Sequence, residues 1–164
     1  MKTTVYLSLG SNLGDRAANL GAAITSLGEL GEIKAVSSFY ETEPVEVTSA
    51  QPWFLNCALA LETEFMPEQL LARTLALEKS MGRRRTQGRS PRTIDIDIIL
   101  FGNSVVDTPD LTIPHSEMQR RRFVLAPLAE IAPEARHPVL KRTVRELLSQ
   151  LPAGAGAVRR YEQG

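Results

Sequence analysis

One segment organises this 164-residue chain, and it reads Pro91-Arg92-Thr93-Ile94-Asp95-Ile96-Asp97-Ile98-Ile99-Leu100-Phe101-Gly102. From Ile94 to Ile98 apolar and acidic residues alternate, which is the period of a β-strand. Asp95 and Asp97 therefore share one face of the predicted strand, about 6.5–7 Å apart along it. Two carboxylates at that spacing can share one divalent cation, or hold two cations that bridge a phosphate chain.

A cationic loop runs directly into this strand. Its arginines are Arg83, Arg84, Arg85, Arg89 and Arg92. Arginines that grip phosphate, beside carboxylates that hold the neutralising metal, are the groups that phosphoryl transfer requires. Either feature alone is typical of a solvated strand face or a solvated loop. Together they favour a site, because two aspartates on one face repel unless positive charge lies between them.

The composition predicts one ordinary globular domain over residues 1–164, with 43% hydrophobic residues, 23% charged residues and a formal net charge of zero. General attraction to nucleic acid is therefore not indicated. The single cysteine, Cys57, rules out an intrachain disulfide and is interpreted as a core residue. We find no signal-peptide pattern and no apolar run of roughly 18 residues. These features predict a cytoplasmic protein with no membrane partner, and a monomer as the default.

Hydrophobic periodicity predicts four main strands and two main helices. The strands are expected over Thr3–Leu9, Ile33–Tyr40, Trp53–Glu62 and Ile94–Ile98, and the helices over Arg16–Leu27 and Pro67–Met81. Further elements are expected as a long polar loop over Glu41–Pro52, a short return strand at Val105–Val106, a constrained loop over Leu111–His115, and helices over Arg120–Leu128 and Thr143–Leu151.

This order predicts an α+β fold, namely a ferredoxin-like β-α-β-β-α-β antiparallel sheet with a C-terminal helical extension. Both main helices are expected on one face of the sheet. The other face would then carry Asn56, Asp95 and Asp97 and be free to build a site.

Five stretches, in order along nearly the whole chain, carry a family resemblance. They are Tyr6 to Asp15 (YLSLGSNLGD), Ser37 to Pro44 (SSFYETEP), Phe54-Leu55-Asn56, Gly82-Arg83 through Pro91 to Asp97, and Ile113-Pro114-His115 with Arg121, Phe123, Val124, Leu125 and Pro127-Leu128. In these stretches the chain resembles the 6-hydroxymethyl-7,8-dihydropterin pyrophosphokinases of folate biosynthesis. The resemblance implies a ferredoxin-like fold and transfer of pyrophosphate from ATP, the co-substrate, to the hydroxymethyl group of a reduced pterin. It also implies two Mg²⁺ ions as cofactors.

The resemblance further implies a role for individual residues. Asp95 and Asp97 would hold both Mg²⁺ ions, and Arg83 and Arg92 would be the catalytic arginines, since a planar permanent cation suits charge spread over phosphoryl oxygens. The implied ATP-binding residues are Glu78, Arg85, Ile98, Leu111, Thr112, His115 and Arg121. The implied pterin-binding residues are Thr42, Pro44, Val45, Phe54, Asn56 and Phe123.

Several of these residues have plainer interpretations. Phe54 and Phe123 taken alone are typical of a hydrophobic core, and Glu78 taken alone is typical of a surface carboxylate. The chain also departs from the family at Arg89-Ser90, where many members carry Trp-Gly, and this difference bears on how the pterin is covered.

Two other functions compete with catalysis. A non-catalytic ferredoxin-like module that senses nucleotide or metal would bind ATP without turnover, and it has less need for paired aspartates beside a phosphate clamp. An RNA-binding ferredoxin-like domain would need aromatic residues and positive charge on the sheet face. Here the predicted face carries aspartates, and only 5% of the residues are aromatic.

Overall fold

The computed structural model describes residues 2–43, 53–82, 93–153 and 157–161. In chain order its elements are β1 (Thr3–Ser11), α1 (Arg16–Leu27), β2 (Glu32–Val36), β3 (Tyr40–Thr42), β4 (Phe54–Thr63), α2 (Pro67–Ser80), β5 (Asp95–Phe101), β6 (Val106–Asp107), β7 (Thr112–Ile113), the 3₁₀ turn η1 (Met118–Arg120), α3 (Arg122–Ile131), α4 (Val144–Ser149) and β8 (Val158–Arg160). None of the helices in these ranges is long and apolar enough to cross a membrane.

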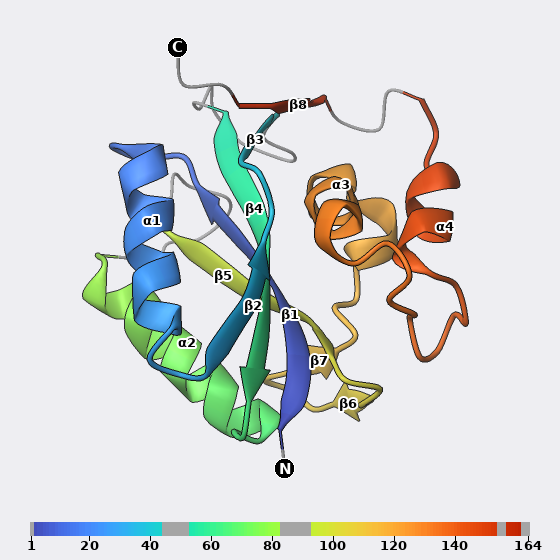
Figure 1. The fold of residues 1–164 in the computed structure, drawn as a ribbon, viewed down its shortest axis with the longest axis horizontal. Coiled ribbons are helices and arrows are strands. Elements are labelled where there is room, and N and C mark those ends of the chain that lie inside the picture. The colour runs from blue at the N-terminus through green and yellow to red at the C-terminus, as the bar shows by residue number, and fades with distance from the viewer. Residues whose placement is uncertain (1, 44–52, 83–92, 154–156, 162–164) are drawn as a thin grey trace.

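An antiparallel sheet lies at the centre of the molecule, with strand order β5-β1-β4-β3-β8 (Figure 1). Strand β1 lies between β4 and β5 and pairs antiparallel with both. Strands β2 and β3 pair with opposite ends of β4 along the same edge. The structure is thus α+β with an antiparallel sheet, as the sequence predicts at that level.

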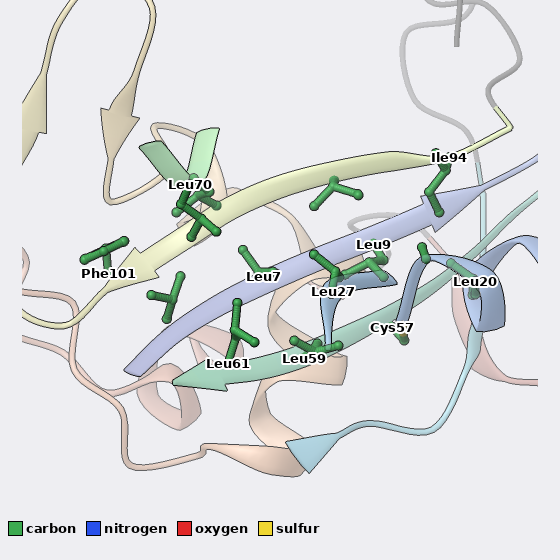
Figure 2. Packing of buried hydrophobic residues seen from close by; sticks show 14 of the residues in the cluster. Leu7, Leu9, Leu20, Leu27, Cys57, Leu59, Leu61, Leu70, Ile94 and Phe101 are labelled. Atoms are coloured by element: carbon green, nitrogen blue, oxygen red, sulfur yellow. The ribbon is translucent and has the colours of Figure 1, made fainter. Parts of the chain in front are cut away.

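Helices α1 and α2 cover one face of this sheet (Figure 1). Figure 2 shows the core that they enclose, where alternate residues of β1 and β4 point toward α1. Its fully buried side chains include Leu7, Leu9, Leu20, Leu27, Leu59, Leu61 and Leu70. Each such leucine contributes about 1.5–3 kcal/mol when it is fully removed from water. Cys57 belongs to this core, as predicted, and burial raises the pKa of its thiol to about 12.

Helices α3 and α4 lie on the other side of the sheet (Figure 1). A second core packs there, in which Ala58 of β4 and Leu100 of β5 meet Leu125 and Leu128 of α3 and Val144 of α4. The prediction that this face is free was therefore wrong for the part beneath α3. A small residue such as Ala58 leaves room for a helix to approach the strands closely.

The two main helices occur where the sequence predicts them, and their ends have local causes. Asp15 caps α1 by accepting a hydrogen bond from the Ala18 amide at 3.1 Å. Pro67 occupies the first turn of α2, where its missing N–H costs nothing. Thr143 and Glu146 form a reciprocal capping box at the start of α4.

Several strand predictions need correction. The single strand expected over Ile33–Tyr40 is two strands, because the hydroxyl oxygen of Ser37 accepts the Ala58 N–H at 2.9 Å in place of a strand carbonyl. Strand β6 does not return along β5 but pairs with β7, inside the segment expected to be a loop. The short strand β8, which extends the sheet beyond β3, has no counterpart in the prediction.

Candidate active site

The two aspartates lie at the start of β5, on the sheet face that α3 only partly covers. Both are half-buried, whereas Ile96 between them is 5% exposed and belongs to the helix-side core. The predicted alternation of this strand is therefore confirmed. Across the sheet, Asp95 is in register with Gly10 of β1, and Asp97 with Ser8.

Glu78 of α2 fixes this part of β5 from the side. It is 2% exposed, and its Oε2 accepts the Ile96 N–H at 2.6 Å. Because β5 is an edge strand, that N–H has no strand partner and needs another acceptor. The interpretation of Glu78 as a surface carboxylate was therefore wrong. Glu78 holds the backbone at the residue between the two aspartates.

From Asp95 the same sheet face continues across β1 and β4 as Gly10, Asn56 and Phe54, and we call these four residues the polar floor. Gly10 is in register with Asn56 on β4, and Asn56 in turn with Tyr40 on β3. A Cβ on Gly10 would lie 2.7 Å from Asn56 Nδ2 and 3.3 Å from the Phe54 ring. Only glycine, which has no Cβ, leaves the Asn56 amide and the Phe54 ring in their places above β1.

The Asn56 amide is held at both ends. The buried Thr42 hydroxyl donates a short hydrogen bond to Asn56 Oδ1. The Nδ2 group of Asn56 donates to the Leu9 carbonyl oxygen at 3.4 Å. An amide that is fixed in this way presents its remaining donor and acceptor capacity in one orientation.

A group of three residues lies beside the aspartates. It consists of His115, Arg121 and Phe123, and we call it the wall. The His115 amide donates to the Ile99 carbonyl oxygen of β5 at 3.0 Å. Burial lowers the pKa of His115 and the Arg121 guanidinium lowers it further, while the carboxylates of Glu117 and Asp95 act in the opposite direction. His115 Nδ1 accepts the Glu117 N–H at 3.1 Å, so the neutral ring carries its proton on Nε2.

Arg121 and Phe123 complete this wall at the start of α3. The Arg121 guanidinium carbon lies 5.5 Å from the centroid of the Phe123 ring, and both residues are half-buried. Cations stack on aromatic faces at this range. The sequence-predicted residues Asp95, His115 and Arg121 are thus close enough to interact electrostatically, although they come from separate parts of the chain.

Three other predicted nucleotide-binding residues, Ile98, Leu111 and Thr112, are not part of this wall. Ile98 and Leu111 have buried side chains in the helix-side core. The N–H and the carbonyl oxygen of Leu111 are both hydrogen-bonded to Thr108. Ile98 lies two residues from Ile96 on the edge strand, and its main-chain N–H points outward in the same direction. Thr112 is exposed on β7.

Five predicted residues lie outside the described residues, and so do Arg89 and Ser90. The five are Arg83, Arg85, Arg92, Pro44 and Val45. Within the described ranges no three acidic, histidine or cysteine side chains gather to hold a metal. Asp95 and Asp97 nevertheless fit Mg²⁺, which takes one or two carboxylates and completes its shell with water and substrate phosphate oxygens.

Sequence reasoning missed Gly10. The prediction ended the first strand at Leu9, whereas β1 continues to Ser11. The available signal was a glycine that follows directly on an alternating strand, where it marks a close approach by another group.

Comparison with known proteins identifies the family. A family model described as 7,8-dihydro-6-hydroxymethylpterin-pyrophosphokinase (HPPK) matches residues 6–133. The chain belongs to the HPPK family. That match includes every residue of the polar floor and of the wall described above.

Similar proteins agree with this assignment to the HPPK family. The chain is 43% identical over 155 residues to a Methylorubrum extorquens protein named 2-amino-4-hydroxy-6-hydroxymethyldihydropteridine pyrophosphokinase, with 93% of this chain and 96% of that protein covered. It is 42% identical over 150 residues to the protein of the same name from Pseudomonas aeruginosa, with 90% and 91% covered. It also matches the Folic acid synthesis protein fol1 of Schizosaccharomyces pombe, at 40% identity, but spans 20% of that protein.

Solved structures show the same fold. The chain superposes on the Plasmodium falciparum HPPK-DHPS wild type with SDX-DHP at a TM-score of 0.74 and 18% identity. The match covers 92% of this chain and 44% of that one. At this identity the likeness concerns the fold alone.

Proposed function

We propose that this chain transfers pyrophosphate, as one unit, from ATP to the hydroxymethyl group of 6-hydroxymethyl-7,8-dihydropterin in folate biosynthesis. The products are AMP and the pterin pyrophosphate. The observation that carries the proposal is the HPPK match over residues 6–133, which contains Asp95 in register with Gly10 and Asn56 on one sheet face. Relatives of similar length are named for this activity.

The polar floor suits the pterin. Asn56, whose amide is fixed by Thr42 and the Leu9 carbonyl, offers donor and acceptor atoms to the edge of a heteroaromatic ring. Phe54 and Phe123 offer aromatic faces for stacking. Pro44 and Val45 remain predicted members of the same pocket.

The wall beside the aspartates suits the nucleotide. Arg121 supplies a permanent cation, and neutral His115 supplies an Nε2–H donor. Thr112, Arg85, Leu111 and the main chain of Ile98 are proposed to complete the ATP site. Glu78 supports that site through the Ile96 N–H. Arg83 and Arg92 are the proposed catalytic arginines.

Asp95 and Asp97 are the residues that would hold Mg²⁺, and we propose two ions. Bound there, Mg²⁺ supplies neutralisation of the triphosphate and a lower pKa for the attacking hydroxyl. The half-buried position of both carboxylates limits their exposure to water, which strengthens their attraction for a cation.

The products define which bond changes. For AMP to leave, the pterin hydroxyl oxygen forms a bond to the β-phosphorus of ATP, and the bond from that phosphorus to the α,β-bridging oxygen breaks. The hydroxyl proton is released to the solution, and AMP keeps the bridging oxygen. Arginines around the triphosphate stabilise the charge that spreads over the phosphoryl oxygens.

The strand order β5-β1-β4-β3, with α1 and α2 on one face, supports a ferredoxin-like core. We further propose that residues 1–164 form a single pyrophosphokinase domain, that it acts as a monomer on ATP and a reduced pterin, and that it works in the cytoplasm.

The test is AMP formation from ATP and Mg²⁺, with and without the pterin. The native chain is expected to form AMP only with pterin, and Asp97→Ala is expected to lose this activity. Glu32→Ala is the matched control, because Glu32 is an exposed strand carboxylate on β2, which pairs with the end of β4 opposite to Asn56. Tight ATP binding by the native chain without turnover would contradict the proposal and favour a nucleotide sensor.

A further inference from the structure

One carboxylate on β3 is shared by two arginines from opposite ends of the chain. Glu41 Oε2 lies 3.0 Å from Arg16 Nη2 at the start of α1. Glu41 Oε1 lies 3.3 Å from Arg159 Nε on β8. Both oxygens of Glu41 are therefore engaged, and the Glu41 and Arg16 side chains are largely shielded from water.

The same two arginines also hold Trp53, which directly precedes β4. Arg16 Nη1 donates to the Trp53 carbonyl oxygen at 3.0 Å. The Arg159 guanidinium carbon lies 4.7 Å from the centroid of the Trp53 ring, within the range of a cation–π contact. Each arginine thus contacts the end of β3 and the start of β4. We call these four residues, Arg16, Glu41, Trp53 and Arg159, the clamp.

The clamp lies behind the polar floor. Thr42 and Phe54 are in register on β3 and β4, and each is the immediate neighbour of a clamp residue. Successive side chains of a strand point to opposite faces. Glu41 is in register with Leu55 of the helix-side core, so it points away from Thr42 and toward α1.

We propose that Arg16 and Arg159 are positioning residues for the pterin pocket: by joining Glu41 to Trp53 they set the spacing of the two strand ends that carry Thr42, Phe54 and Asn56. This inference rests on the function proposed above and deepens it. The two Nη groups of one rigid guanidinium reach both strand ends at once. A lysine ammonium at position 16 keeps the charge but lacks that planar fork.

The experiment compares Arg16→Gln and Arg159→Gln with Arg145→Gln. Arg145 is the matched control, because it forms an exposed ion pair with Glu134 at 2.7 Å, away from the clamp. Arg16→Gln is expected to raise the pterin KM about tenfold, as expected when a hydrogen-bonded charged group is lost. The KM for ATP and kcat should stay near their native values. Arg159→Gln should act in the same direction but less, since its side chain is 66% exposed.

Two further measurements separate positioning from general stability. Arg16→Lys should recover part of the pterin KM, while Arg145→Gln should match the native chain. Trp53 is the single tryptophan of the chain, so its fluorescence reports the clamp directly. Arg159→Gln should make Trp53 more accessible to acrylamide quenching, with no loss of thermal stability beyond that of Arg145→Gln.

The outcomes are distinct. An active native chain whose pterin KM is unchanged in Arg16→Gln overturns the positioning role. A variant with lower kcat and lower thermal stability but an unchanged pterin KM also overturns the positioning role, because that result indicates a purely structural contact. A native chain that forms no AMP overturns the proposed function, and the pterin role of the clamp falls with it.

Discussion

The two faces of the central sheet are built from the same strands but have opposite chemistry. On the helix side, β1 and β4 present Leu7, Leu9, Leu59 and Leu61, all fully buried beneath α1 and α2 (Figure 2). On the other side the same strands present Gly10 and Asn56, next to the aspartates of β5. Alternation along a strand lets one segment supply a core and a site at once.

Stability and chemistry are therefore separable between the two faces of the sheet. The helix-side residues gain stability from close packing and lose it when their volume changes. The site-side residues are held by named hydrogen bonds, such as those of Asn56 and Glu78, and contribute little apolar burial. Substitutions on the two faces should therefore affect different measurements.

The largest effect is expected from Asp95→Asn. Removing one carboxylate from the proposed metal site should lower kcat for AMP formation by about 10³-fold, the scale of losing a group that stabilises the transition state. The free energy of unfolding should change by no more than about 0.5 kcal/mol, because the side chain is half-buried and keeps its volume. Steady-state kinetics and urea unfolding check the two values. A stable variant with native kcat would contradict the assignment of the chemistry to this face of the sheet.

Leu59→Ala tests the opposite face. This fully buried leucine should cost about 2–5 kcal/mol of unfolding free energy through lost burial and a residual cavity. The folded fraction should keep its pterin KM and its kcat. Leu140→Ala is the control, since Leu140 is exposed and should change stability by about 0.5 kcal/mol or less. A selective loss of pterin affinity in Leu59→Ala would show that the faces are coupled.

Gly10→Ala tests the role of the close approach between β1 and the Asn56 amide. Its Cβ would lie 2.7 Å from Asn56 Nδ2, so the amide must move, and the pterin KM should rise about tenfold for the loss of one fixed hydrogen-bonding group. Gly21→Ala, in α1, is the matched control because nothing lies within 4 Å of its added Cβ. That variant should be stabilised by up to about 1 kcal/mol, since alanine favours helix. Equal pterin KM values in the two variants would contradict the proposed role of Gly10 in positioning the Asn56 amide.

The smallest effect concerns pH and the two histidines of the chain. Burial lowers the pKa of both below 6.5, and Arg121 adds to this effect at His115. The neutral rings are therefore favoured by folding, and this stability is present above pH 6.5 and is lost as the pH falls through the folded-state values.

NMR titration of the native chain and of His137→Gln assigns each histidine resonance. In His137 the neutral Nδ1 accepts the N–H groups of Val139 and Leu140, at 3.2 and 3.0 Å. Protonation removes that acceptor, so urea unfolding should show lower stability at pH 5 than at pH 7.5. A folded-state pKa above 6.5 at either histidine would contradict this prediction, because that histidine would then stabilise the fold at low pH.

Much of the fold is readable from local pattern. The alternation of Ile94 to Ile98 and the helical spacing in Arg16–Leu27 predict elements that the structure confirms. What the pattern could not provide depends on contacts between distant residues. The break at Ser37 requires the Ala58 amide, and β8 requires the edge of β3. The cover of α3 over the second face likewise depends on tertiary packing around Ala58.

The site divides in the same way. The spacing of Asp95 and Asp97 along the strand predicts their pairing from the sequence alone. The position of His115 and Arg121 beside them depends on the fold. The burial of Glu78 could not be read from its own helix, because its partner is a main-chain N–H of a different strand. The glycine after an alternating strand indicates a close approach at Gly10, but only the structure identifies Asn56 and Phe54 as the approaching groups.

Transfer of pyrophosphate as a unit on the polar face of the sheet can be tested directly. The most direct measurement is ³¹P NMR of ATP incubated with the native chain, Mg²⁺ and 6-hydroxymethyl-7,8-dihydropterin. We expect AMP and a pterin-linked diphosphate, formed in equal amounts and only when pterin is present. Formation of ADP with a pterin monophosphate would contradict it, because attack would then occur at the γ-phosphorus.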